Sequence, residues 1–410
     1  MRQANVDELR RMGRIIYLDV KPEEVVRRLA GDTTRPLLQG ENVDQRVREL
    51  MGQRGPVYEA AADIIVPVTG IEIDEMNLDA ILITDRYNMR YIASYRGEGI
   101  IVLAGSGKTV ITDSRYTEQV QRECEGYECA DIAGKGYVAC ISSILDGQRK
   151  NSGNLRVGFE NLSISYREYS EYSTGISGVE WISLDGKLDS LREIKTDEEI
   201  ENINTAESIG DKAFSHILEY LRPGITEKDV ALELEYHMKK NGAEGLSFDT
   251  IAASGMNSSM PHAIPTDKTL NKGDFLTMDF GCIYEGYCSD MTRTVAIGKA
   301  SDSMKYVYDT VLKAQTESMN MIKPGVRCND VDAVARRIIA DAGYGDCFGH
   351  GLGHSVGLFI HENPRFSPKC DDILKPGMVI TVEPGIYIPG QFGVRIEDLV
   401  VCAVNGSPVL

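Results

Sequence analysis

The fold is decided by a stretch of sequence that occurs twice. Residues 222–243 read RPGITEKDVALELEYHMKKNGA, and residues 323–344 read KPGVRCNDVDAVARRIIADAGY, 101 positions later. A second echo follows in the same order, because KGDFLTMDFG ends at Gly281 and KPGMVITVEPG ends at Gly385. Two echoes in one order indicate an internal repeat. We therefore expect a pseudo-twofold domain, in which each half is a helix, a turn, a helix and an acid-bearing strand, and equivalent strands face one another across a shared sheet.

The acids of each half lie on two runs joined by turn residues. In MDFGCIYEGYCSDMTRT, Asp279 and Asp290 stand eleven residues apart, on either side of YEGY. In TVEPGIYIPGQFGVRIEDLV, Glu383 and Glu397 flank a turn rich in proline and glycine. Two strands joined in this way can bring both carboxylates to one side. A twofold relation between the halves then makes four carboxylates converge.

Four converging carboxylates in an apolar sheet require a counter-charge, because each raises the pKa of the others and burial adds to the cost. Arg293 and Arg395 can answer two of them. Two divalent cations match all four, and a hydroxide that bridges such a pair forms at neutral pH. The glycine-rich stretch FGHGLGHSVGLFIHENP adds imidazole groups, namely those of His350, His354 and His361.

Composition narrows the class of protein. The 410 residues are 42% hydrophobic, which predicts large cores and two or three domains. The formal net charge of -18 disfavours nucleic acid and anionic membrane surfaces as partners. Nine cysteines, an odd number with no C-x-x-C pair, favour a reducing cytoplasm. We find no apolar run that approaches the length of a membrane span.

The stretch LAGSGKT at residues 103–109 resembles a phosphate-binding loop, but it lacks a required residue. The motif needs glycine five positions before Gly107, where this chain has Val102. An apolar strand pattern ends at Gly105 and a β-branched run begins at Thr109. We therefore expect SGK to be the tight turn of a hairpin.

Four motifs in one order carry a family resemblance. MDFG…SDMTRT, GHGLGHSVGLFIHE, TVEPGIY and GVRIED resemble the pita-bread metallopeptidases, most closely the Xaa-Pro aminopeptidases (aminopeptidase P). Upstream, LDAILITDRYNMRYIASYRG and TDSRYTEQ resemble the creatinase-like domain that precedes the catalytic domain in this family. The resemblance covers roughly residues 77–410. It implies an α/β creatinase-like domain at residues 71–190 and an α+β pita-bread catalytic domain at residues 191–410.

The resemblance also implies a dinuclear metal site. Asp290 and Glu397 match the residues that bridge the two ions, and Asp279 matches the residue that chelates one ion. His354 and Glu383 match the residues that hold the other. The family usually uses manganese, with cobalt or zinc as alternatives.

Catalytic roles follow from the same resemblance. His262, in SSMPHAIP, matches a histidine on the substrate side of the site. His361 and His350 match histidines that steady the scissile carbonyl and the proline side of the substrate, and Glu383 matches a proton shuttle. Two further residues match positions that orient carboxylates, Arg395 and Thr292.

The implied reaction is hydrolysis of the bond before proline in peptides that carry proline at their second position. We expect an aminopeptidase that acts as a homo-oligomer, a dimer, in the cytoplasm. The Xaa-Pro dipeptidases share every metal ligand and are the nearest alternative. A metal-free peptide-binding module is a second alternative, although such relatives lack the metal ligands.

Residues 1–70 depart from this family and resemble the carboxy-terminal half of a shikimate kinase. TTRPLLQG resembles the lid of that enzyme, and Arg35 and Arg54 match its lid and substrate arginines. The phosphate loop and the shikimate-binding part would precede Met1, so we expect no kinase activity. Saturable binding of ATP would support a kinase-related function instead.

Overall fold

The computed structural model describes residues 77–105, 107–149, 154–404 and 406–410. Within the first 76 residues it describes positions 45, 47, 48 and 51 and the backbone of two strands, β1 (Ile16–Asp19) and β2 (Ile64–Pro67), which pair in parallel. The kinase-like lid with Arg35, and the predicted substrate arginine Arg54, lie outside the described residues.

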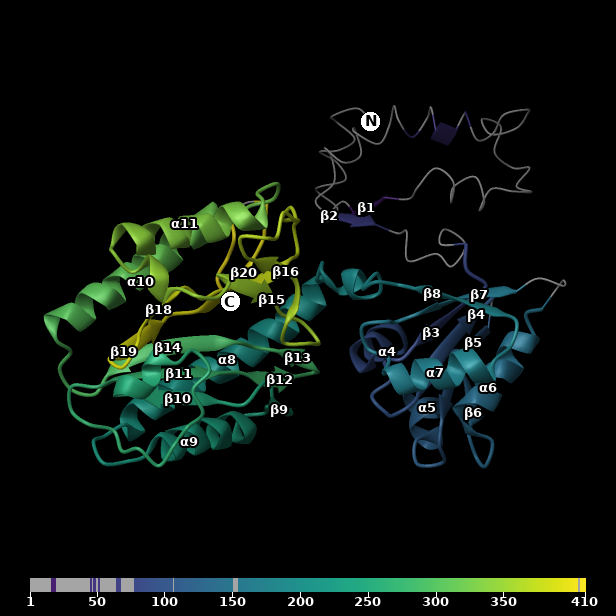
Figure 1. The fold of residues 1–410 in the computed structure, drawn as a ribbon, viewed down its shortest axis with the longest axis horizontal. Helices are drawn as coiled ribbons and strands as arrows, with labels where there is room; N and C mark the ends of the chain where they lie inside the picture. Colours follow the sequence, from purple (N-terminus) through teal and green to yellow (C-terminus); the bar gives the residue numbers. More distant parts are fainter. Residues whose placement is uncertain are drawn as a thin grey trace.

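A six-stranded mixed sheet forms the centre of the first α/β unit, which lies on the right in Figure 1. Its spatial order is β6-β5-β4-β3-β7-β8. The strands are β3 (Ala80–Ile83), β4 (Ile100–Ala104), β5 (Gly107–Thr112), β6 (Glu128–Asp131), β7 (Leu155–Phe159) and β8 (Val179–Ser183). The helices are α4 (Arg86–Ala93), α5 (Thr117–Glu123), α6 (Gly136–Asp146) and α7 (Tyr166–Gly175).

Strand β3 explains why this sheet is covered on both faces. All four of its residues are buried. Ala80 and Leu82 pack in one core with residues of α6 and α7, whereas Ile81 and Ile83 pack in a second core with residues of α4 and α5. Because successive strand residues point to opposite faces, the helices form one layer on each side.

The predicted hairpin at LAGSGKT is present, with a small difference in its position. Strands β4 and β5 pair in antiparallel fashion from Ala104 and Gly107 outward, and Gly105 adopts the left-handed conformation with φ 56°. Glycine accepts this conformation without strain. The second strand begins at Gly107, and Lys108 lies within it. The prediction that SGK forms the turn was therefore wrong by about two residues.

Two helix pairs confirm the internal repeat. The first pair is α8 (Asp197–Tyr220) and α9 (Glu227–Lys240), and the second is α10 (Asp302–Met321) and α11 (Cys328–Asp341). Both ends of α11 lie 101 positions after the ends of α9. Helices α8 and α9 each begin with a capping box, at Thr196 and Thr226, in which side chains satisfy the first free backbone N–H groups.

The strands of the second unit lie between these helix pairs, as Figure 1 shows on the left. Their hydrogen-bonded orders are β10-β11-β14, β13-β12-β9, β16-β15-β17-β20 and β18-β19. In the first half the strands are β9 (Gly245–Leu246), β10 (Ile251–Ser254), β11 (Phe275–Phe280), β12 (Cys282–Tyr284), β13 (Tyr287–Cys288) and β14 (Met291–Ala296). In the second half they are β15 (Gly353–Ser355), β16 (Glu362–Phe366), β17 (Val379–Val382), β18 (Gly385–Ile388), β19 (Phe392–Arg395) and β20 (Asp398–Val401).

The strands of the two halves do not form one continuous hydrogen-bonded sheet. The prediction of a shared sheet was wrong in this respect. The two halves meet where the Glu397 amide donates to the Thr292 carbonyl oxygen at 3.1 Å. Beside it, Thr294 Oγ1 donates to the Arg395 carbonyl oxygen at 2.8 Å. A side chain replaces a backbone partner at this seam, which interrupts the regular ladder.

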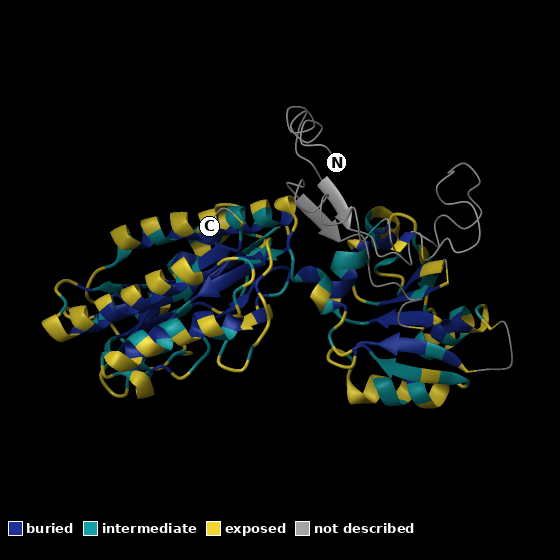
Figure 2. Ribbon diagram, turned by 90° about the horizontal axis from the view of Figure 1, so that it is seen from above, coloured by how far each residue is buried: buried dark blue, intermediate teal, exposed yellow. Residues whose placement is uncertain are grey.

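Burial follows the same layers. Figure 2 shows buried strands inside both units and exposed residues on the outer faces of the helices. Three short 3-10 turns complete the described elements, η2 (Asp189–Arg192), η3 (Gly255–Ser259) and η4 (Gly345–Cys347). In the part of the chain that the structure describes, no helix combines the length and the apolar character that a membrane crossing requires.

Candidate metal centre

The four predicted carboxylates come from equivalent places in the two halves. Asp279 lies near the end of β11, and Asp290 immediately precedes its antiparallel neighbour β14. Glu383 immediately follows β17, and Glu397 immediately precedes its antiparallel neighbour β20. The short hairpins β12–β13 and β18–β19 occupy the chain between the members of each pair. The two predicted hairpin-like connections are therefore present.

Two glycines allow the strands to approach closely at this place. A Cβ atom at Gly281 would overlap the Ser289 carbonyl oxygen, next to Asp290. A Cβ atom at Gly353 would overlap the Thr381 carbonyl oxygen, beside His354. The glycines of MDFG and GLGH are thus required by backbone packing beneath the acids and the histidine.

The orientation of His354 leaves one ring nitrogen directed at the acids. Its Nδ1 lies 3.2 Å from the Ser355 carbonyl oxygen, a contact in which Nδ1–H must donate. Nε2 then carries the free lone pair and lies 3.5 Å from Asp290 Oδ2 and 3.6 Å from Glu383 Oε1. Burial, with His361 nearby, lowers the pKa of His354 to about 3. A neutral imidazole with its lone pair turned toward carboxylates is suited to a metal ion.

The carboxylates strongly perturb one another. Burial, and then the charges of Glu397 and Asp279, raises the pKa of Asp290 well above its usual value. Burial, followed by Glu383 and Asp279, does the same for Glu397. Burial raises the pKa of Glu383 to about 8, although Arg395 opposes the shift. Nearby positive charge would return all three groups to their ionised form.

Arg395 and Thr292 contact the acids as predicted. The Arg395 guanidinium pairs with Asp279 Oδ2 and donates to Thr292 Oγ1 at 3.0 Å. Thr292 Oγ1 in turn donates to Glu397 Oε2 at 2.6 Å. Arg293 was expected to answer one of the four acids, but it pairs with Asp398 at 2.7 Å instead. Among the described residues, Arg395 is therefore the one guanidinium that forms an ion pair with any of the four carboxylates.

Two acceptor atoms at the centre lack a partner among the residues that the structure describes. Asp279 Oδ1 and Glu397 Oε1 are buried and accept no hydrogen bond from any of them. Among the described residues, ligand atoms of Asp290, His354 and Glu397 lie within 4.8 Å of one another. Buried carboxylate oxygens without donors are costly unless a cation is bound. Oxygen donors with one imidazole suit first-row divalent cations such as manganese, cobalt and zinc.

All predicted site residues line one cavity of about 530 Å³. They are His262, Asp279, Asp290, His350, His354, His361, Glu383 and Glu397. Apolar side chains of Phe248, Ile251, Ile264 and Pro265 form another part of its wall. A mostly apolar cavity with a few convergent polar groups is typical of a site for a small ligand.

The three histidines outside the acid cluster differ in how they are held. The ring of His361 meets the ring of His354 edge to face, with centroids 4.5 Å apart. His350 uses both ring nitrogens, since Nδ1 donates to the Gly351 carbonyl oxygen at 2.7 Å and Nε2 lies 2.9 Å from the Tyr387 hydroxyl. Burial, with Arg395 nearby, lowers the pKa of His350 to about 4, so its ring is neutral. His262 lies in the loop after η3 and lines the same cavity.

Sequence reasoning missed Arg365 as a residue of the cavity. It lies on β16, four positions after His361, and lines the cavity with an exposed side chain. Its guanidinium forms no ion pair or hydrogen bond with any residue that the structure describes. Burial, and then the charge of Arg365, lowers the pKa of His361. The available signal was a cation directly after the histidine-rich stretch of a strongly acidic chain.

Comparison with known proteins agrees with this geometry. Residues 201–403 match Metallopeptidase family M24, residues 72–194 match the Creatinase/Prolidase N-terminal domain, and residues 1–82 match Shikimate kinase. An Xaa-Pro dipeptidase from Pyrococcus horikoshii is 38% identical, over 82% of this chain and 93% of that protein.

Two solved structures are similar over the same part of the chain. The Xaa-Pro dipeptidase from Bacillus anthracis has a TM-score of 0.78 and 42% identity, over 82% of this chain and 94% of that one. The X-Pro aminopeptidase from Thermotoga maritima has a TM-score of 0.75 and 37% identity, over 82% and 97%. With its creatinase-like first unit and its pita-bread second unit, this chain belongs to metallopeptidase family M24.

Proposed function

We propose that this protein hydrolyses the Xaa-Pro bond of dipeptides with the help of two divalent metal ions. The guanidinium of Arg365 lines the cavity without a partner among the described residues, and this observation favours dipeptides. In a dipeptide, the carboxylate follows directly after the proline whose bond is cut. A cation in the same cavity as the catalytic groups can bind that carboxylate through two parallel hydrogen bonds.

Five residues would hold the metal ions. Asp290 and Glu397 would bridge them, Asp279 would bind one, and His354 with Glu383 would bind the other. The unpartnered oxygens of Asp279 and Glu397 support this assignment. When bound, such a pair of cations lowers the pKa of water to near neutrality and acts as a Lewis acid. Manganese is the metal we propose, with cobalt and zinc as the alternatives.

The residues of the chain would supply positioning and proton transfer. Glu383 would take a proton and deliver it to the departing proline nitrogen. The ring of His361 would donate a hydrogen bond to the scissile carbonyl oxygen as negative charge develops there. His262 would contact the substrate, and His350, whose nitrogens are already bonded, would meet the proline ring with a carbon edge.

An Xaa-Pro aminopeptidase remains the second candidate. The relative named X-Pro aminopeptidase supports it. The exposed side chains of His361 and Arg365, which line the cavity, are also compatible with a substrate that extends beyond the proline. The difference between the two activities lies in whether a residue after the proline is tolerated.

We further propose the division of the chain into residues 1–70, 71–190 and 191–410, which the extents of the matched families support. A cytoplasmic location fits the nine cysteines, none of which forms a disulfide. We also propose a homodimer, which light scattering of the purified protein would test.

The deciding experiment compares Ala-Pro with Ala-Pro-Ala as substrates of the metal-stripped protein, with and without added manganese. We expect manganese-dependent cleavage of Ala-Pro and much slower cleavage of Ala-Pro-Ala. Faster cleavage of the tripeptide would make the protein an aminopeptidase. Cleavage that persists in excess chelator, or no cleavage of either peptide, would refute the proposed function.

A further inference from the structure

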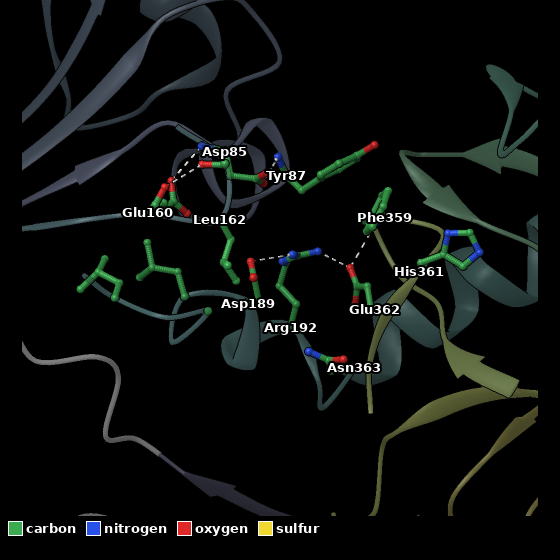
Figure 3. Close-up of a pocket in the computed structure, with 14 residues that line it drawn as sticks. Asp85, Tyr87, Glu160, Leu162, Asp189, Arg192, Phe359, His361, Glu362 and Asn363 are labelled. Atoms are coloured by element: carbon green, nitrogen blue, oxygen red, sulfur yellow. Dashed lines mark hydrogen bonds and ion pairs between the residues drawn. The ribbon is translucent and has the colours of Figure 1, made fainter. Parts of the chain in front are cut away.

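A buried carboxylate directly follows His361 and is used by none of the steps above. The side chain of Glu362 is 4% exposed. Its Oε1 pairs with Arg192 Nη1 and accepts from the Phe359 amide at 3.1 Å, and its Oε2 pairs with Lys195 Nζ at 3.0 Å. Figure 3 shows the Glu362 carboxylate turned toward Arg192, whereas the ring of His361 lies away from it.

Both cations come from the segment that connects the two α/β units. Arg192 ends η2, and Lys195 lies just before α8. Their side chains are 7% and 2% exposed, so water does not compete for these contacts. The Lys195 amide donates to the Gly377 carbonyl oxygen at 2.9 Å, which ties the segment to the catalytic unit. Lys195 Nζ also lies 3.1 Å from Ser355 Oγ, next to His354.

Arg192 is itself held from the first unit. Its Nε donates to Asn88 Oδ1 at 3.0 Å, and its Nη2 pairs with Asp189 at 3.1 Å. Asn88 Nδ2 donates to Glu160 Oε1 at 2.6 Å. Two side chains besides Glu362 therefore hold the guanidinium, whose planar fork is rigid and keeps its orientation.

The loop before His361 depends on this carboxylate. The carboxylate packs on Gly357, where a Cβ atom would overlap it, and it accepts the Phe359 amide. The ring of Phe359 lies 4.9 Å from the ring of Tyr87, on the first unit. The ring of His361 itself makes one edge-to-face contact with His354 and one with Phe359. No described residue forms a hydrogen bond with this ring. The place of the His361 ring is therefore set mainly through its backbone.

We propose that Glu362, clamped by Arg192 and Lys195, is the positioning residue of His361, so that the segment between the two units sets the place of this histidine in the cavity. The effect on kinetics rests on the proposed function, in which His361 stabilises the scissile carbonyl. In this arrangement the first unit contributes to hydrolysis without touching the substrate. Misplacement of a catalytic group by a fraction of an ångström reduces turnover far more than substrate binding.

A double-mutant cycle tests whether Glu362 acts through His361. The variants are Glu362→Gln, His361→Asn and the double variant, with Asp267→Asn, in an exposed pair with Lys228, as the control. We expect Glu362→Gln to lower kcat by about tenfold or more with KM nearly unchanged, and to have almost no further effect when His361 is already asparagine. Arg192→Lys, which keeps the charge but loses the fork, should behave in the same way and serves if Glu362→Gln does not fold. An equal loss in both His361 backgrounds would overturn the proposal.

A spectroscopic readout separates this inference from the proposed activity. With histidine labelled by ¹⁵N, the ring signals of His361 are assigned from the His361→Asn variant. Glu362→Gln should shift those signals and leave unchanged the signals of His216, which lies near the carboxy-terminal end of α8 and stacks on His237. Unshifted His361 signals would refute the positioning role, even if the wild-type protein proves active. Shifted signals in a protein that cleaves no Xaa-Pro peptide would support the positioning role and refute the proposed function alone.

Discussion

Replacing Arg365 with methionine should change which peptide the protein prefers. The guanidinium lines the cavity and has no partner among the described residues, so nothing in the protein competes with a substrate carboxylate for it. A hydrogen bond between charged groups contributes about 1.5–3 kcal/mol. Because the side chain is exposed, the lower end applies, and about 1.4 kcal/mol corresponds to tenfold in kcat/KM. Arg365→Met should therefore lose about tenfold on Ala-Pro.

The tripeptide provides the control for this prediction. In Ala-Pro-Ala the carboxylate lies one residue farther from the scissile bond, a displacement of about 3.5 Å. Arg365→Met should therefore change kcat/KM for Ala-Pro-Ala by less than about threefold, and Arg365→Lys should lie between the wild type and Arg365→Met on Ala-Pro. Both peptides release their amino-terminal alanine, so initial rates from a coupled alanine assay suffice for the measurement. Equal losses on both peptides, or no loss on Ala-Pro, would refute the carboxylate-binding role.

Three further predictions concern the metal centre and its surroundings. Asp290→Asn should lower kcat/KM by more than about a hundredfold, because loss of a residue that merely orients a metal ligand already lowers metal affinity or activity by about 10–100-fold. Near wild-type activity in a steady-state assay would contradict this prediction. Gly353→Ala should lower the free energy of unfolding in urea by about 1–3 kcal/mol or more, since its Cβ overlaps the Thr381 carbonyl oxygen; unchanged stability would show that the strands yield. The pKa of His350 is lowered from 6.5 to about 4 in the folded protein. The neutral ring therefore makes its full contribution to the free energy of unfolding above pH 6.5, and this contribution is lost as the pH falls toward 4. The loss amounts to about 3 kcal/mol, and His350→Asn should remove that part of the pH dependence of unfolding.

The repeat and the acid cluster could be predicted because both leave local patterns. The two turn-and-helix stretches keep the same spacing, and α9 and α11 begin and end at equivalent positions. Glycines beside acids at predicted strand ends mark Asp279 and Glu383. A twofold relation then brings four acids together without any knowledge of their partners.

The partners of the charged residues could not be predicted, because they come from distant parts of the chain. Glu362 meets Arg192 across 170 positions of sequence, and Lys195 across 167. Nothing local distinguishes these three buried charges from ordinary surface residues. Arg293 shows the opposite error, since its closeness in sequence to the acids suggested a contact that Asp398 takes instead. The interruption between the two halves of the sheet likewise depends on side chains at the seam.

We propose that the buried carboxylates form a site for two divalent cations. The number of ions can be measured after the protein is stripped with chelator, reloaded with manganese and freed of unbound metal, by mass spectrometry of manganese per chain. We expect about two ions per chain in the wild type and a clear loss in Asp290→Asn. Fewer than about one ion per chain in the reloaded wild type would contradict it.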